Sequence, residues 1–200
     1  MNTVLLVFQK NIELGKVKTR LASSIGDFEA LNIYKKLVTH TKTIIDSVKA
    51  EKQIWYSNFI QENDIWHTST YKKNKQQGSS LGSRMQYAFE TAFLRPKITK
   101  VIIVGTDCAE INTQMVETAF STLDKNDFVL GPAKDGGYYL LGMQAFYPSV
   151  FVDIPWSTDQ AFSYTVKTIK KLNKNVCFLP TLHDVDTLED WQRARKYLEP

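Results

Sequence analysis

Six short apolar runs, each of strand length, alternate along the chain with segments of helical periodicity. The runs are TVLLVF (3–8), QIWYS (53–57), KVIIVG (100–105), DFVLG (127–131), YYLLGM (138–143) and NVCFL (175–179). The segments with helical spacing of apolar residues are 28–49, 81–94, 112–123, 159–172 and 187–198. Strands that alternate with helices predict an α/β fold, an open and mostly parallel sheet with helices on both faces.

The runs at 127–131 and 138–143 are too close together for a helical crossover between them. At least one strand is therefore predicted to pair antiparallel, which makes the sheet mixed. Sheets of this kind bind ligands outside the carboxyl ends of their strands. Functional residues are accordingly expected just after the apolar runs.

Length and composition set the outer limits of the prediction. A chain of 200 residues fits a single domain, residues 1–200, with a core of its own. Hydrophobic residues make up 43% and charged residues 23%, which is typical of a soluble globular protein. The net charge of +4 is spread along the chain, so binding to nucleic acid is not predicted.

Membrane and export signals are absent from the sequence pattern. No apolar stretch approaches the roughly 20 residues of a membrane span, and the first run is too short for a signal peptide. Cys108 and Cys177 match no zinc or disulfide spacing, which agrees with a reducing compartment. The expected location is the cytoplasm. The polar segment KKNKQQGSS, residues 72–80, is predicted to be a long loop.

The segment GKVKTR follows the first apolar run and carries three cations. If it is extended, Lys16, Lys18 and Arg20 share one face, and Gly15 permits the tight turn and close approach that a phosphate requires. At an effective dielectric near 20, a charge pair about 4 Å apart is worth about 4 kcal/mol. The pattern indicates a phosphate site; the alternative is a solvated loop that leads into a helix.

Two acidic stretches indicate a site for Mg²⁺ or Mn²⁺. Asp107 comes directly after KVIIVG, where a carboxylate suits a hard divalent cation. It could instead cap the next helix, although Asn112 or Thr113 could also do so. Asp184 and Asp186 alternate, so in an extended stretch one or both could supply the second ligand.

The second acidic stretch also has a structural interpretation. Thr187 and Asp190 have the spacing of a capping box before the last predicted helix. Asp186 could then serve only to neutralise the start of that helix. Asp184 has no such structural role in the pattern.

Three further motifs are candidates for substrate or nucleotide contact. In GPAKDGGYYLLG, Asp135 could bond a hydroxyl while Gly136 and Gly137 leave room for substrate, or the segment could be a plain hairpin loop. In PWST, Trp156 offers a stacking surface and Ser157 and Thr158 offer hydroxyls, or one of these hydroxyls caps the following helix.

The segment QQGSSLGSRM is the third of these motifs. Gly82 and Arg84 are candidates for contact with a base or a phosphate. The alternative is that Ser80 or Ser83 simply forms the N-cap of the helix that follows.

Taken together and in order, GKVKTRLA, LGSRM, GTDC, GPAKDGGYYLLG, PWST and DVDT resemble a known group of sequences. This is a bacterial family of candidate glycosyltransferases, also called radical-SAM/selenodomain-associated transferases, of the nucleotide-diphospho-sugar transferase superfamily. The resemblance runs from Phe8 to the last predicted helix. It implies one Rossmann-like domain of the GT-A type, a three-layer α/β/α sandwich.

The resemblance also implies roles for residues that match the family motifs. By position, Lys16, Lys18 and Arg20 would contact the donor phosphates. Asp107 would hold the metal, together with Asp184 or Asp186. The glycines of DGGYY, Gly136 and Gly137, would border the acceptor or the sugar. Asp107, Lys18 and Arg20 are accordingly the expected catalytic residues.

Three positions depart from the family pattern. Leu14 stands where the family usually has a proline before the glycine of the first loop, which should loosen that turn. Thr106 and Ala109 replace the usual serine and proline around Asp-Cys. Ser80 replaces the aspartate before Leu-Gly, so this chain lacks whatever contact that carboxylate makes.

The expected function is metal-dependent transfer of a glycosyl group from a nucleotide-sugar to a small-molecule acceptor. A metal ion and fixed cations would neutralise the charge that develops on the departing phosphate oxygen. Two alternatives stay open. One is a nucleotidyltransferase that acts on a nucleoside triphosphate and releases pyrophosphate, and the other is a nucleotide-binding protein without catalytic activity.

Overall fold

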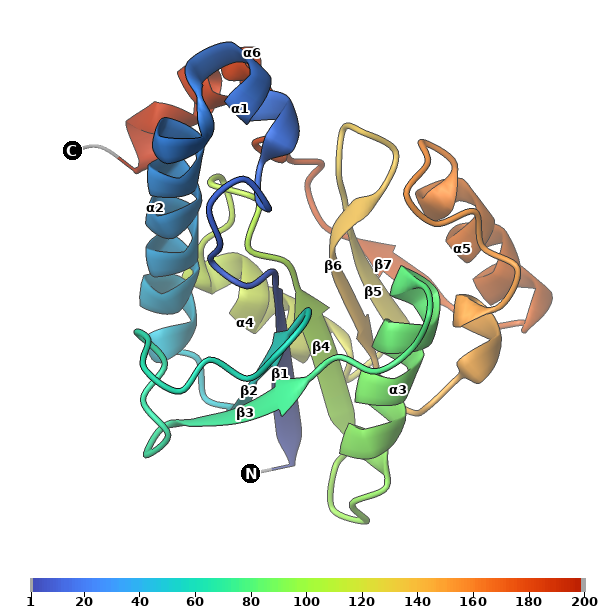
Figure 1. Ribbon diagram of the computed structural model, residues 1–200. Coiled ribbons are helices and arrows are strands. Elements are labelled where there is room, and N and C mark those ends of the chain that lie inside the picture. Colours follow the sequence, from blue (N-terminus) through green and yellow to red (C-terminus); the bar gives the residue numbers. More distant parts are fainter. Residues whose placement is uncertain (1, 199–200) are drawn as a thin grey trace.

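The computed structural model describes residues 2–198 and contains a seven-stranded sheet between layers of helices (Figure 1). The strands are β1 (Thr3–Gln9), β2 (Glu51–Tyr56), β3 (Tyr71–Lys75), β4 (Lys100–Val104), β5 (Phe128–Pro132), β6 (Tyr138–Met143) and β7 (Val176–Phe178). The helices are α1 (Thr19–Ile25), α2 (Asp27–Asp46), α3 (Leu81–Phe93), α4 (Thr113–Thr122), α5 (Ala161–Lys171), α6 (Leu188–Ala194) and the short 3₁₀ helices η1 (Pro148–Phe151) and η2 (Arg195–Tyr197). Residues 1, 199 and 200, at the ends of the predicted domain, lie outside the described residues.

The sheet is mixed and mostly parallel, as predicted. Its strand order is β3-β2-β1-β4-β6-β5-β7, and β6 runs antiparallel to both of its neighbours. The short GPAKDGG connection forces this reversal, since it leaves no room for a crossover helix. The start of β6 therefore lies at the same edge of the sheet as the carboxyl ends of β1 and β4.

Each face of the sheet is covered by its own helices. Ile102 and Val104 of β4 point to the face packed by α2 and α4, whereas Val101 and Ile103 point to the face packed by α3, η1 and α5. Figure 1 shows these two layers on opposite sides of the sheet. Because central strands are buried on both faces, they form continuous apolar runs in the sequence.

A smaller apolar cluster joins α1, α2 and α6 above the carboxyl edge of the sheet. Leu21 of α1 and Ile33 of α2 belong to it, together with Val185 and Ala194 from the far end of the sequence. Figure 1 shows α1 and α6 next to each other at the top of the molecule. This cluster brings the segment after β1 close to the segment that precedes α6.

The structure corrects two predictions of local structure. Residues 71–75, which overlap the predicted loop at 72–80, form the edge strand β3 paired with β2. Lysines are common on edge strands because they discourage further pairing, and they hide the apolar alternation that marks a strand. The segment GKVKTR is not extended either: Gly15 turns at φ 70°, Lys18 is left-handed at φ 50°, and α1 begins at Thr19.

Three helix starts follow the capping alternatives from the sequence. The Asn112 side chain accepts a hydrogen bond from the Met115 amide, so Asn112 caps α4. Ser80 caps α3: its side chain accepts a hydrogen bond from a backbone amide of α3, and a side chain of α3 accepts one from the Ser80 amide, which together form a capping box. Thr187 and Asp190 form the capping box of α6.

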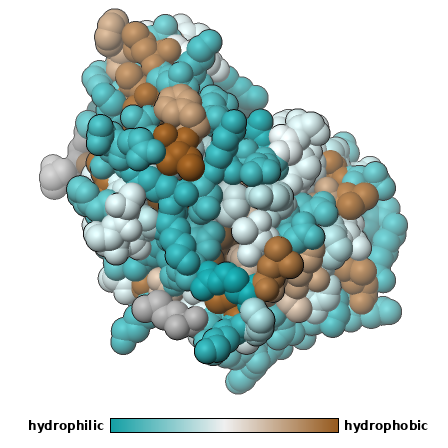
Figure 2. Space-filling model, turned by 60° about the horizontal axis from the view of Figure 1, so that its bottom comes forward, coloured by the Kyte–Doolittle hydropathy of each residue, from teal (hydrophilic) through white to brown (hydrophobic). Residues whose placement is uncertain are grey.

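The face toward the amino ends of the strands is mainly hydrophilic, with separate apolar patches (Figure 2). Of the helices within residues 2–198, none combines the length and the apolar character that a bilayer crossing requires.

Candidate functional site

A cleft of about 700 Å³ lies at the carboxyl edge of the sheet. It is lined by the ends of β1 and β4, the start of β6, parts of α1 and α3, and the segments that contain Trp156 and Asp184. Most of the motifs selected from the sequence therefore meet in one place, at the edge where ligands were expected.

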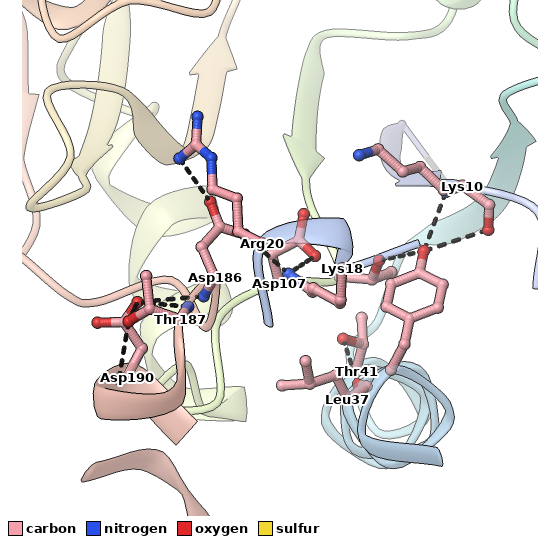
Figure 3. Close-up of polar contacts among 11 residues, drawn as sticks. Lys10, Lys18, Arg20, Leu37, Thr41, Asp107, Asp186, Thr187 and Asp190 are labelled. Atoms are coloured by element: carbon pink, nitrogen blue, oxygen red, sulfur yellow. Dashed lines mark hydrogen bonds and ion pairs between the residues drawn. The ribbon is translucent and has the colours of Figure 1, made fainter. Parts of the chain in front are cut away.

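Lys18 lies at the centre of the charged part of the cleft. Its Nζ contacts Asp107 Oδ1 and lies 3.3 Å from Asp186 Oδ1, and only 4% of its side chain is exposed. Figure 3 shows Lys18 between the two carboxylates. Burial lowers the pKa of Lys18, but the charges of Asp107 and Asp186 outweigh it and leave the pKa above its ordinary value. The side chain is therefore a charged ammonium.

The main chain holds the two acidic segments together. Cys108 and Asp184 form an isolated antiparallel bridge, and the Val185 amide donates a hydrogen bond of 2.9 Å to the Asp107 carbonyl. Val185 is buried in the cluster between α1, α2 and α6, which anchors the second segment. Asp107 and Asp186 therefore meet at Lys18 because β4 and the segment before α6 are joined there.

The acidic side chains of the cleft are not fully neutralised. Burial, together with the charges of Asp107 and Asp135, raises the pKa of Asp184 to about 7, while Lys18 acts in the opposite direction. A cation that entered this part of the cleft would relieve the repulsion between the carboxylates.

The three cations of the first loop do not form one wall. Arg20 is 79% exposed and lines the cleft, with its Nη1 3.8 Å from Asp186 Oδ2. Lys16 and Gly15 lie in the exposed turn before α1, outside the cleft lining found for residues 2–198. The prediction of a shared face was wrong because the segment turns at Gly15 and Lys18, where φ is positive, and α1 then begins at Thr19.

The glycine motifs mainly serve packing between loops. Gly136 has φ 86°, and a Cβ there would overlap the main chain of Asp159. The room beside Gly136 is therefore taken by protein. Asp135 and Gly137 line the cleft, and Asp135 Oδ1 accepts a hydrogen bond of 2.9 Å from the Gly137 amide.

Gly82 has a similar packing role in α3. A Cβ at Gly82 would overlap the indole of Trp156, so the missing side chain lets Trp156 pack against the start of α3. The indole also meets the Tyr138 ring edge to face, with ring centroids 6.1 Å apart. Trp156 lines the cleft in this position.

The other residues of these two motifs also lie at the cleft. Ser157 is strained at φ 64° and lines the cleft with Thr158, whose hydroxyl donates to the Pro155 carbonyl at 2.7 Å. Arg84 also lines the cleft, and its Nε donates to the Gly78 carbonyl at 3.1 Å. That bond fixes the loop before α3.

Several cleft residues were missed by sequence reasoning. The Tyr34 hydroxyl donates to the Lys10 carbonyl and lies 3.1 Å from Thr106 Oγ1. Gln76 is buried and donates from Nε2 to the Trp55 carbonyl at 2.9 Å. Tyr34 follows the helical period of α2 like a core residue, and Gln76 lay in the predicted loop. Gln76 could have been indicated by its position directly after a strand, had β3 been recognised, whereas no pattern separated Tyr34 from a core residue of α2.

The carboxylates of the cleft suit a hard cation only if a bound phosphate supplies further oxygen ligands. Within residues 2–198, no three His, Cys, Asp or Glu side chains are arranged to hold a metal ion. Asp107 and Asp186 do converge on one point, at the Lys18 ammonium. Mg²⁺ is commonly held by one or two carboxylates together with substrate phosphates, so these two residues fit such an ion.

Comparison with known proteins identifies the family. A family described as "Uncharacterized protein conserved in bacteria (DUF2064)" matches residues 40–158, more than half of the chain. The chain belongs to the DUF2064 family. No protein with curated function shows a significant sequence match to it.

Solved structures extend the similarity of this DUF2064 protein to its whole length. A candidate nucleotide-diphospho-sugar transferase from Desulfovibrio desulfuricans G20 is 30% identical, with a TM-score of 0.88 over 98% of this chain and 92% of that chain. CMP:2-keto-3-deoxy-manno-octonic acid synthetase in complex with CTP is 10% identical, with a TM-score of 0.58 over 98% of each chain. 4-Diphosphocytidyl-2C-methyl-D-erythritol synthase from Anaerococcus prevotii DSM 20548 is 9% identical, with a TM-score of 0.58 over 100% and 97%. The last two similarities show a shared fold.

Proposed function

We propose that this protein is a transferase that uses a nucleotide-activated donor and moves a glycosyl group from a nucleotide-sugar to a small-molecule acceptor. The observation that carries the proposal is the cleft in which Lys18 and Arg20 meet the acidic side chains of Asp107 and Asp186. Its volume of about 700 Å³ is in the usual range for small-molecule sites. The 30% identity to a candidate nucleotide-diphospho-sugar transferase supports the same donor class.

The charged residues suit the departure of a nucleoside diphosphate. In glycosyl transfer, an acceptor hydroxyl attacks the anomeric carbon, the bond from that carbon to the phosphate oxygen breaks, and charge builds up on the leaving group. Lys18 and Arg20 would stabilise this charge as cationic hydrogen-bond donors. Asp107 and Asp186 would hold Mg²⁺ or Mn²⁺, which when bound supplies Lewis-acid stabilisation of the same oxygen.

The part of the cleft around Trp156 and Asp135 suits the acceptor. Trp156 offers an aromatic face beside Thr158, and Asp135 is held by the Gly137 amide at the cleft surface. Asp135 would hydrogen-bond the acceptor hydroxyl and receive its proton. These residues come from the start of β6 and the loop before α5, so donor and acceptor would enter from different sides of β4.

Product analysis tests the proposal. The purified protein is incubated with Mg²⁺ or Mn²⁺ and, separately, with pools of nucleotide-sugars and of nucleoside triphosphates. Release of a nucleoside diphosphate supports glycosyl transfer, and release of pyrophosphate instead shows nucleotidyl transfer. If the protein binds a nucleotide but releases neither product, it is a nucleotide-binding protein without catalytic activity.

A matched pair of variants assigns any activity to the cleft. Asp107→Asn is expected to abolish turnover. Asp124→Asn makes the same change at an exposed residue paired with Lys100 and is expected to keep full turnover. Equal activity of the two variants would refute the assignment of the site.

A further inference from the structure

The Lys18 ammonium fills the point at which the carboxylates of Asp107 and Asp186 converge. Nζ contacts Asp107 Oδ1, lies 3.3 Å from Asp186 Oδ1, and belongs to a side chain that is 4% exposed. A divalent cation held by the same two carboxylates would need the space and the oxygen lone pairs that the ammonium uses.

The two cations exclude each other at this point. Positive charges at contact distance repel strongly in a partly buried site. A metal ion that binds Asp107 and Asp186 must therefore move the ammonium away. Conversely, while the ammonium stays in place, it offsets one of the two negative charges and occupies the point between the carboxylates, so they attract a metal ion less strongly.

The side chain of Lys18 can move without the main chain. The Lys18 carbonyl accepts a hydrogen bond of 2.8 Å from the Ala22 amide, which fixes the backbone at the start of α1. The side chain is a flexible stem with a compact charge at its end. Lys18 lines the cleft together with Thr19 and Arg20, so a rotated side chain would direct its ammonium into the cleft.

We propose that Lys18 is a placeholder for the divalent cation. In the ligand-free protein its ammonium pairs with both Asp107 and Asp186. A metal ion that arrives with the donor phosphates displaces it, and the released ammonium then contacts those phosphates. The proposal rests on the proposed function, because the donor supplies both the missing metal ligands and the new partner of Lys18.

Ordered loading of the cleft follows from the exchange. Among residues 2–198, no three acidic or other ligating side chains are grouped to hold an ion. The protein alone therefore offers a poor metal site that Lys18 also blocks. Phosphate and metal ion should bind together far more tightly than the metal ion binds alone.

Binding of Mn²⁺, followed by electron paramagnetic resonance, tests the exchange without any assay of activity. Wild-type protein is titrated with Mn²⁺ alone and with inorganic pyrophosphate, and a protein-free titration corrects for the complex that forms in solution. Pyrophosphate is expected to tighten Mn²⁺ binding about tenfold or more. An equal affinity with and without pyrophosphate would overturn the placeholder role, and this comparison needs no variant.

Two variants separate displacement from a general loss of positive charge. Lys18→Met keeps the length of the stem and removes the ammonium, so it is expected to bind Mn²⁺ alone about tenfold more tightly than wild type. Arg20→Met removes one charge from the same cleft, but from a side chain that is 79% exposed, and should have a much smaller effect. Thermal unfolding of each variant checks that it is folded.

The failures of the two proposals can be told apart. If wild type binds Mn²⁺ with pyrophosphate but Lys18→Met gains no more than Arg20→Met, the placeholder role is wrong and the donor site stands. If wild type binds neither Mn²⁺ nor pyrophosphate, the donor site itself is refuted, and the placeholder role with it.

Discussion

Replacement of Asp184 by asparagine should stabilise the metal-free protein, and more so as the pH rises. An aspartate in an unfolded chain has a pKa of about 3.9. In the folded protein the pKa of Asp184 is about 7, because burial and the charges of Asp107 and Asp135 oppose ionisation. The folded state therefore binds this proton more tightly than the unfolded state does.

The sign and size of the pH dependence follow from these two values. The stabilising contribution is fully present below a pH of about 4 and is lost as the pH rises through about 7. The pKa values differ by about three, which corresponds to about 4 kcal/mol at most. About 3 kcal/mol of this loss falls between pH 5 and pH 8, because two of the three pH units lie in that interval. Asparagine has no proton to lose and avoids the loss.

Urea unfolding at pH 5 and pH 8, with a chelator present, measures the effect. The free energy of unfolding of Asp184→Asn, relative to wild type, should rise by about 3 kcal/mol between these pH values. The exposed substitution Asp124→Asn should show no such rise. If Asp184→Asn loses stability at pH 8, the carboxylate is compensated in the folded protein, and the excess of negative charge inferred for the cleft is wrong.

Three further changes test packing around the site. Gly82→Ala places a methyl group against the Trp156 indole and should shift the tryptophan emission; unchanged emission would contradict the packing of the two residues. Thr187→Ala removes the cap of α6 and should lower the free energy of unfolding by about 1 kcal/mol in urea, an effect that a threonine without a capping hydrogen bond would not show. Phe89→Ala, on the buried face of α3, should cost about 3–5 kcal/mol by the same assay, and a loss below about 1 kcal/mol would argue against full burial.

The fold was predictable where local pattern and tertiary position agree. The run at 100–105 became β4 because a central strand buried on both faces is apolar throughout. The reversal at β6 followed from the short GPAKDGG connection. Strand β3 was missed because lysines are favoured on edge strands, and here they hide the alternation of apolar and polar residues that marks a strand.

For the candidate site, the sequence indicated which residues to consider better than it indicated how they are arranged. Asp107, Asp184 and Asp186 could be selected because each follows a segment that delivers it to the carboxyl edge of the sheet. The burial of Lys18 could not be read from GKVKTR, since both of its partners come from distant segments and one is 168 residues away in the sequence. Extended spacing suggested a row of exposed cations, whereas the left-handed turn at Lys18 directs its side chain inward.

The bridge between Cys108 and Asp184 has a consequence for synthesis of the protein on the ribosome. While the chain is growing, Lys18 emerges long before Asp186, and the first strands can begin to pair before the second acidic segment exists. The charged cleft is therefore among the last parts of the molecule to be completed. A nascent chain that stalls just before residue 184 would carry all seven strands but not the bridge that brings Asp186 to Lys18.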